Sequence, residues 1–256
     1  MTTELLTERQ GSTLLITLSG PATRNALSPQ VYAAGIELLN VADSDPTVHA
    51  VVITGSGGHF CGGGDLQRLA HNRQHDLNIQ GDNIDSFHQW IEAIRSFPKP
   101  VIAAVEGVAA GGGLSLALAC DLLVTGYNAR FVSAYSRVGL SPDGGASWQL
   151  ARLLPKPLAL SWLWQGGEMS AQQLQPWGLV HEVVPAGQVL SKAMALAESL
   201  AATPAGVLSS IKELVNDAPF QSLNTHLAAE KRHFLVNLSR PEAGSAIQAF
   251  LSRKKP

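Results

Sequence analysis

The chain of 256 residues is poor in cysteine and has no excess of charge of either sign. Its two cysteines, Cys61 and Cys120, lie among apolar or glycine residues without the spacing of metal ligands. This pattern favours reduced thiols in a cytoplasmic protein, and we expect Cys61 to fill space in the core rather than act as a nucleophile. Eighteen basic and twenty acidic residues give a formal net charge of −2, which provides no general attraction for nucleic acid or an anionic membrane.

The chain also lacks long apolar runs and complete phosphate-binding motifs. It contains no run of about 18 apolar residues, and residues 1–19 lack the charged and then apolar pattern of a leader, so we expect neither a membrane-spanning nor a secreted protein. The third glycine of a dinucleotide-binding turn is missing, because Phe60 and Leu116 stand at the two places where it would fall. No Gly-Lys-Ser/Thr follows any glycine run, so nucleotide binding is disfavoured.

Glycine is abundant instead, and two runs of three glycines follow apolar segments. Residues 101–121 predict a buried strand, a glycine turn and a small-residue helix that opens on the glycines at 111–113. Residues 51–54 and the run G-G-G-D-L at 62–66 repeat this design. Glycine lets a ligand approach the N–H groups at a helix start, which are unpaired and carry the positive end of the helix dipole. Two such turns are able to aim two N–H groups at one oxygen, as in sites that stabilise enolates.

The order of the expected elements indicates the fold class. Residues 65–83 are rich in His, Asn, Gln and Asp, and predict a mobile helix or loop beside the first glycine turn. Strand-turn-helix units come first and a mainly helical pattern follows from residue 158, which argues for an α/β fold with an α-helical C-terminal part. We expect strands at 14–18, 48–54, 101–105, 122–125 and 129–133, helices at 29–41 and 84–97, and a third glycine turn at 139–145 before another helix.

Five motifs together resemble the enoyl-CoA hydratase/isomerase, or crotonase, superfamily over essentially the whole chain. The resemblance implies an α/β spiral of ββα units, which we assign to residues 1–195, and a helical C-terminal trimerisation region at 196–256. It also implies acyl-CoA substrates, in which coenzyme A is part of the substrate, no metal or other cofactor, and a homotrimer or a dimer of trimers. The motifs are R-N-A-L at 24–27, F-C-G-G-G-D-L at 60–66, P-K-P-V-I-A-A-V-E-G-V-A-A-G-G-G from 98, C-D at 120–121 and G-L-S-P-D-G-G from 139.

The resemblance also assigns residues to an oxyanion hole and to coenzyme A contacts. In that family two backbone N–H groups form the oxyanion hole, and here they fall on Gly64 and Gly112. A C-terminal basic position, commonly lysine, is Arg253 here, and arginine is able to bind phosphate with two N–H groups. Without the resemblance, such charged residues are more often solvated surface. The implied coenzyme A contacts are Arg24, Ala26, Gly62, Asp65, Leu66, Phe250 and Arg253.

The chain departs from the family's hydratases at both catalytic glutamates. Ser115 and Tyr135 stand at these positions, and neither side chain is a carboxylate base near neutral pH. Hydration by the family's usual mechanism is therefore not expected. Residues 72–87 and the pair Trp162 and Trp164 are candidates for the walls of an acyl pocket, although tryptophans in a helical region more often belong to a core or a subunit interface.

Asp143 and His88 decide between the remaining chemistries. The resemblance implies two roles for Asp143, the acid/base of ring-epoxide phenylacetyl-CoA isomerases or the nucleophile of 4-chlorobenzoyl-CoA dehalogenase, while an isolated Pro-Asp-Gly fits a helix N-cap equally well. His88 falls where the dehalogenase has its histidine base, although a histidine on an amphipathic helix is more often a solvent-facing or packing residue. Our first hypothesis is isomerisation through an enolate with Asp143 as the proton carrier.

Three alternatives stay open beside the isomerase. One is a dehalogenase or hydrolase in which Asp143 attacks carbon and His88 activates water. The others are a hydratase that works through unusual residues and an acyl-CoA-binding member without activity. RNA binding, which occurs in one branch of the family, is disfavoured by the near-neutral charge and the absence of a basic run. The sequence does not identify the acyl group.

Overall fold

The computed structural model describes residues 2–253, and its centre is a six-stranded sheet. The strands lie in the order β1-β2-β3-β4-β6-β9, in which β1 and β2 are antiparallel and the other neighbours are parallel. The strands of this sheet are β1 (Glu4–Gln10), β2 (Thr13–Ser19), β3 (Ala50–Gly55), β4 (Val101–Val105), β6 (Leu122–Gly126) and β9 (Glu182–Val184). A second sheet has the order β5-β7-β8, from β5 (Val108–Ala110), β7 (Arg130–Val132) and β8 (Glu168–Ser170).

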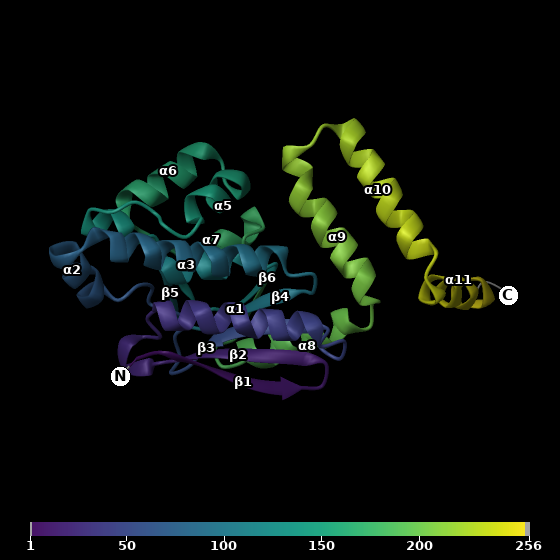
Figure 1. Ribbon diagram of the computed structural model, residues 1–256, viewed down its shortest axis with the longest axis horizontal. Coiled ribbons are helices and arrows are strands. Elements are labelled where there is room, and N and C mark those ends of the chain that lie inside the picture. The colour runs from purple at the N-terminus through teal and green to yellow at the C-terminus, as the bar shows by residue number, and fades with distance from the viewer. Residues whose placement is uncertain (1, 254–256) are drawn as a thin grey trace.

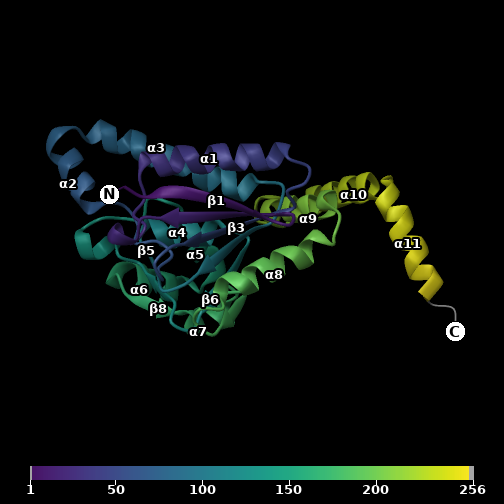
Figure 2. The ribbon, with the colours of Figure 1, turned by 90° about the horizontal axis from the view of Figure 1, so that it is seen from below.

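Helices cover both faces of the main sheet, which is why its central strands are continuous apolar runs. In β3, Val51 and Ile53 belong to the larger core, which includes side chains of α1 and α3, whereas Ala50 and Val52 pack with α8 on the opposite face. Figure 2 shows α1 and α3 on one side of the sheet and α8 on the other. The helices are α1 (Pro29–Ser44), α2 (Leu66–His75), α3 (Leu77–Ser96), α4 (Gly112–Ala119), α5 (Ala146–Leu153), α6 (Lys156–Gln165), α7 (Ala171–Leu174), α8 (Val189–Ala201), α9 (Ala205–Asp217), α10 (Leu223–Leu238) and α11 (Pro241–Arg253).

The last three helices extend away from the sheets. Figure 1 shows α9 and α10 beside the layered part of the molecule, with α11 at the end most distant from α2. Residue 195 lies inside α8, and the division of the chain at that point stays a prediction. No single helix within residues 2–253 is both long and apolar enough to cross a membrane, and the segments 189–201 and 205–220 meet those criteria only as a pair bent by 106°.

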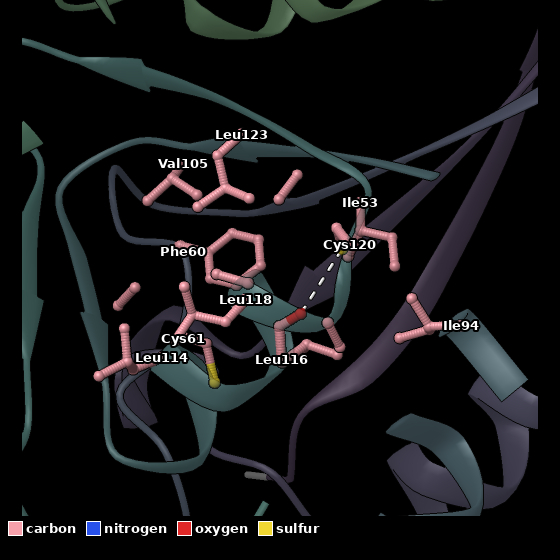
Figure 3. Packing of buried hydrophobic residues seen from close by; sticks show 14 of the residues in the cluster. Ile53, Phe60, Cys61, Ile94, Val105, Leu114, Leu116, Leu118, Cys120 and Leu123 are labelled. Carbon is pink, nitrogen blue, oxygen red and sulfur yellow. Dashed lines mark hydrogen bonds between the residues drawn. The ribbon is translucent and has the colours of Figure 1, made fainter. Parts of the chain in front are cut away.

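Local signals predicted two helix starts correctly. The Ser28 side chain caps α1 by accepting a hydrogen bond from the Val31 N–H, and Pro29 is the first helical residue. The helix expected to open on the second glycine run is α4, which begins at Gly112. Every residue of α4 is buried, and Figure 3 shows its leucines packed around Phe60. The sequence of this helix is apolar all round for that reason.

Several expected bounds were wrong. Residues 65–83, for which a loop was one expectation, are mainly helical, and the helix expected at 84–97 begins at Leu77, where Asp76 caps it by accepting from the Asn78 N–H. Strand β1 was not predicted, because it is an exposed edge strand without an apolar alternation. Strands β8 and β9 interrupt the region expected to be almost wholly helical, and at three residues each they are too short to show a periodicity.

The two cysteines are buried thiols, as expected. Figure 3 shows both sulfur atoms among apolar side chains, with Cys120 bonded to the Leu116 carbonyl oxygen. Burial raises the pKa of the Cys61 thiol to about 12, although a hydrogen bond from the Gly63 N–H opposes the shift. Cys61 is therefore protonated at neutral pH, which confirms that it is a core residue and not a nucleophile.

Candidate active site

The two glycine turns lie directly against each other. The Ala110 N–H donates to the Cys61 carbonyl oxygen over 2.9 Å, which ties the two turns together just before their glycines. Gly63 has a φ of +93°, and a Cβ atom there would lie 2.6 Å from the Ala110 carbonyl oxygen and 3.2 Å from the Gly112 nitrogen. A residue with a side chain does not fit at position 63, because it would strain the backbone and push the turns apart.

The segment 24–27 holds the first glycine turn from the other side. The Gly62 N–H donates to the Arg24 carbonyl oxygen over 2.7 Å, and the Leu27 N–H donates to the Gly63 carbonyl oxygen over 2.8 Å. Asn25 is fully buried with a φ of +57°, and its Nδ2 donates to carbonyl oxygens of the 56–60 loop while its Oδ1 accepts from the Gly20 N–H. Asn25 is thus the residue that fixes the loop, a role that the sequence analysis did not assign.

Gly64 and Gly112 present unpaired N–H groups. Gly112 is the first residue of α4, so its N–H has no partner within the helix. Within residues 2–253, neither this N–H nor that of Gly64 has a protein acceptor. Both glycines line one cavity of about 150 Å³, together with Gly62 and Gly63. The loops chosen from the sequence therefore contribute two free donors to the lining of the same cavity.

The rest of the cavity is lined by apolar and polar side chains that come from separate elements. Tyr32 of α1 stacks on Phe87 of α3, with 5.0 Å between the ring centroids, and Arg68 of α2 donates to the Leu27 carbonyl oxygen over 2.7 Å. The sequence analysis assigned no role to Tyr32 or Arg68. The apolar lining residues are Leu27, Leu66, Leu69, Ile84, Phe87, Ala134, Val138 and Leu140, and the polar ones are Tyr32, Asp65, Arg68, Gln80, Asn83, Tyr135 and Asp143.

The two carboxylates in the cavity lining, Asp65 and Asp143, have different structural roles. Asp65 caps α2, because its Oδ1 accepts hydrogen bonds from the N–H groups of Gln67 and Arg68 at 2.8 and 3.3 Å. Asp143 caps no helix, since α5 begins three residues later and its N-cap is Gly145, which makes no side-chain cap bond. The N-cap interpretation of Asp143 is therefore wrong, and its carboxylate is available for chemistry.

Asp143 contacts a tyrosine hydroxyl. The Tyr135 hydroxyl donates to Asp143 Oδ1 over 2.7 Å, and the Ser115 hydroxyl lies 3.4 Å from the Tyr135 oxygen. Ser115 and Tyr135 are both buried, and burial is the main cause that raises the pKa of the Tyr135 phenol, with the Asp143 charge second. Tyr135 is thus a protonated donor at neutral pH, and no protein donor to Asp143 Oδ2 is found in the part of the chain that the structure describes.

His88 lies beside the same loop but meets a different part of it. It is exposed on α3, and its Nε2 is 2.6 Å from the main-chain carbonyl oxygen of Asp143. The imidazole does not line the cavity, so it comes close to the carboxylate without hydrogen bonding to it.

The tryptophan pair lies away from the cavity. Trp162 is buried, with its Nε1 bonded to the Gly167 carbonyl oxygen, and Trp164 is exposed. Neither side chain lines the cavity, so the expectation that this pair forms an acyl pocket wall was wrong for this cavity.

The comparison with known protein families agrees with this arrangement. The family model described as enoyl-CoA hydratase/isomerase matches residues 8–256. The chain belongs to the enoyl-CoA hydratase/isomerase family. This is a family of acyl-CoA enzymes, so the resemblance based on five motifs is confirmed, and the fold is the crotonase fold.

Relatives in the family differ in the reaction that their names state. The chain is 31% identical to 1,2-epoxyphenylacetyl-CoA isomerase of Escherichia coli K12, over 98% of this chain and 97% of that protein. It is 34% identical to 2,3-dehydroadipyl-CoA hydratase of the same organism, over 99% and 97%. The crystal structure of an enoyl-CoA hydratase from Polaromonas sp. JS666 is similar with a TM-score of 0.96 and 52% identity, and 98% of each chain is covered. Identities of 31% and 34% to an isomerase and a hydratase do not separate the two reactions.

Within this enoyl-CoA hydratase/isomerase chain, the expected coenzyme A contacts fall into two groups. Gly62, Asp65 and Leu66 line the cavity, and Arg24 and Ala26 lie in the segment bonded to the same turn. Phe250 lies on α11, which both ribbon views place at the opposite end of the molecule from α2, and the side chain of Arg253 lies outside the described residues. One chain brings the first group together and does not bring Phe250 to the cavity.

Proposed function

We propose that this family member is an acyl-CoA isomerase. In this proposal the N–H groups of Gly64 and Gly112 bind the thioester carbonyl oxygen, and Asp143 is the acid/base. The observation that carries the proposal is that one cavity is lined by both glycines with unpaired N–H groups and by a carboxylate that does not cap a helix. Donors aimed at a developing oxyanion contribute about 3 kcal/mol each, and a positioned proton carrier contributes roughly 10²- to 10⁴-fold in rate.

The proposed reaction moves one proton along the acyl chain. Asp143 removes a proton from the carbon next to the thioester carbonyl, and the electron pair of that C–H bond moves to the carbonyl oxygen as an enolate. The two N–H groups stabilise the negative charge on that oxygen. The protonated Asp143 then returns the proton to a carbon further along the chain, the enolate collapses and the double bond shifts. No atom is gained or lost.

The surroundings of Asp143 favour this reaction over the two alternatives. A hydratase needs a base to activate water, and Ser115 and Tyr135 supply hydroxyl groups that stay protonated at neutral pH. A dehalogenase needs a base for the water that attacks the aspartyl ester, and the His88 Nε2 is already bonded to a main-chain carbonyl oxygen. An isomerase needs only the carboxylate and the oxyanion donors, both of which the cavity contains.

The test is a panel of thioesters followed by mass spectrometry of the products. We expect vinylacetyl-CoA to yield crotonyl-CoA at unchanged mass, and crotonyl-CoA itself to gain no water. Asp143→Asn should abolish the isomerisation while binding of coenzyme A persists. Addition of water to crotonyl-CoA at a rate that exceeds isomerisation would support a hydratase, and exchange of chloride for hydroxyl in 4-chlorobenzoyl-CoA would support a dehalogenase. Binding without turnover of any thioester would support a non-catalytic member.

We also propose that the protein is a homotrimer or a dimer of trimers in which the C-terminal helices pair. The support is a groove between α9, α10 and α11 in which large apolar side chains, including Leu227, Phe234 and Ile247, are about half exposed or more. Exposed apolar patches of this kind mark interaction surfaces. Light scattering with size-exclusion chromatography distinguishes a trimer from a hexamer, and a monomeric mass would contradict the proposal.

A further inference from the structure

We propose that Tyr135 is a positioning residue that hydrogen bonds to the Asp143 carboxylate and fixes which carboxylate oxygen takes the substrate proton; this inference rests on the proposed function of Asp143. Tyr135 occupies a position at which the sequence analysis expected only the loss of a hydratase glutamate. Its role here is a different one, because the hydroxyl group acts on the neighbouring carboxylate.

The geometry gives Tyr135 one strong partner. Its hydroxyl donates to Asp143 Oδ1 over 2.7 Å, which is the usual length of an O–H···O bond to a carboxylate. The other neighbour, the Ser115 hydroxyl, lies 3.4 Å away and is placed to donate to the phenol oxygen or to the Gly111 carbonyl oxygen. Asp143 Oδ1 is thus occupied, and Oδ2 is the oxygen that remains for the substrate.

The burial of the groups around it strengthens the hydrogen bond from Tyr135 to Asp143. Tyr135 and Ser115 are buried, and the phenol lies beside the second glycine turn, since a Cβ atom on Gly111 would be 4.0 Å from the Tyr135 Cζ. A hydrogen bond donated to a carboxylate favours its ionised form. Loss of the Tyr135 hydroxyl is therefore expected to move the acid limb of the pH profile of kcat to higher pH.

The arrangement also separates positioning from substrate binding. The phenol donates its single proton to Asp143, so it has no second proton to offer to a thioester. The oxyanion donors are main-chain N–H groups and do not depend on it. Loss of the hydroxyl should consequently change kcat and the acid side of the pH profile, with little change in KM.

The main experiment compares Tyr135→Phe with the wild-type enzyme on vinylacetyl-CoA over a range of pH. We expect kcat to fall about 10- to 100-fold, the size of a hydrogen bond to a charged group, while KM changes less than about twofold. We expect the acid limb of the pH profile to move up by roughly one pH unit. Tyr127→Phe is the matched control, because Tyr127 is exposed after β6, outside the cavity lining, and its replacement should leave all three quantities unchanged.

A further measurement keeps the proposal testable if Tyr135→Phe folds poorly. Fluorotyrosine at position 135 has nearly the same size as tyrosine and is a stronger hydrogen-bond donor, so the acid limb of the pH profile should move to lower pH. A superimposable pH profile for Tyr135→Phe, an unshifted limb with fluorotyrosine, or a loss expressed in KM alone would overturn the proposal. Full activity of Asp143→Asn would instead overturn the proposed function itself.

Discussion

The Nε2 atom of His88 lies 2.6 Å from the main-chain carbonyl oxygen of Asp143, so the imidazole bonds to the backbone that carries the carboxylate and not to the carboxylate. The two residues are 55 positions apart in the sequence, and their contact joins α3 to the loop before α5. A donor in this place helps to hold the Asp143 loop, whichever reaction the carboxylate performs. The contact predicts a modest and replaceable role for the histidine.

We expect His88→Gln to retain most of the isomerase activity, because a glutamine amide is also able to donate to a carbonyl oxygen. His88→Ala should lose roughly fivefold in kcat, the effect of one neutral hydrogen bond that orients the loop. Steady-state kinetics on vinylacetyl-CoA measures both. If the protein is a dehalogenase instead, His88→Gln incubated with 4-chlorobenzoyl-CoA should accumulate an aroyl ester, visible by mass spectrometry on the peptide that contains Asp143.

The proposed oxyanion hole is tested most directly at Gly112. Proline at this position removes the N–H, and the first residue of a helix is where proline is best tolerated, so we expect Gly112→Pro to fold. Gly112→Ala is the matched control: it keeps the N–H, and its Cβ would lie 3.3 Å from Leu27 Cδ1, a contact that a small shift relieves. We expect Gly112→Pro to lose about 10²- to 10³-fold in kcat and Gly112→Ala much less.

Circular dichroism establishes first that both Gly112 variants are folded. Turnover of a folded Gly112→Pro protein at the rate of the alanine variant would exclude the N–H of Gly112 from the oxyanion hole. A similar loss in both variants would point to crowding of Leu27 and not to the missing donor.

Arg24 is an expected coenzyme A contact that lies beside the first glycine turn, where its carbonyl oxygen accepts from the Gly62 N–H. It is exposed with a φ of +53°, and asparagine is among the few residues that adopt this conformation readily, so Arg24→Asn removes the charge without added backbone strain. We expect coenzyme A to bind roughly 3- to 10-fold more weakly to this variant, with a smaller dependence on salt. Lys156→Gln removes one charge from an exposed helix start elsewhere, and should leave calorimetric binding unchanged. Equal affinities of Arg24→Asn and wild type would contradict the contact.

The parts of the fold that were predicted correctly have local causes. Ser28 with Pro29 marks a helix start, and three glycines after a strand mark another, because capping and backbone freedom depend on a few adjacent residues. Strand β1 was missed since its residues are largely exposed and gain their order from pairing with β2. The family motifs supplied what local patterns do not, namely the closed arrangement of units that brings the two glycine turns together.

The site was predictable as a set of loops and less so as a set of contacts. Gly64, Gly112 and Asp143 could be chosen because glycine and carboxylate chemistry is visible in residue types. The bond from Tyr135 to Asp143 depends on the direction of two side chains across a short turn, and the His88 contact depends on how α3 packs. Such directions follow from tertiary packing, which no periodicity in the sequence encodes.

An ion pair, Lys212 with Asp121, joins the C-terminal helices to the core, and its disruption should make stability depend on pH. Lys212 Nζ on α9 lies 2.8 Å from Asp121 Oδ2 and 3.1 Å from the Ile94 carbonyl oxygen, and the same Asp121 oxygen accepts from the Val101 N–H. Burial raises the pKa of the Asp121 carboxyl, and the neighbouring Lys212 opposes the rise. An acid with a raised pKa in the folded state favours folding most below its ordinary pKa, and this contribution is lost as the pH rises through the raised value.

Lys212→Met removes the group that holds this pKa down, so Asp121 is left buried with an uncompensated charge at neutral pH. We expect a loss of about 1–3 kcal/mol in unfolding free energy near neutral pH, less than for a fully buried pair because 13% and 25% of the two side chains are exposed. The loss should shrink as the pH is lowered and Asp121 takes up a proton. Asp121→Asn added to Lys212→Met should recover most of it, because the amide keeps an acceptor for the Val101 N–H without the charge. Calorimetric melting of the wild type and the two variants at several pH values measures this. A deficit of Lys212→Met that is the same at every pH would show that the lysine acts through its packing and not through its charge.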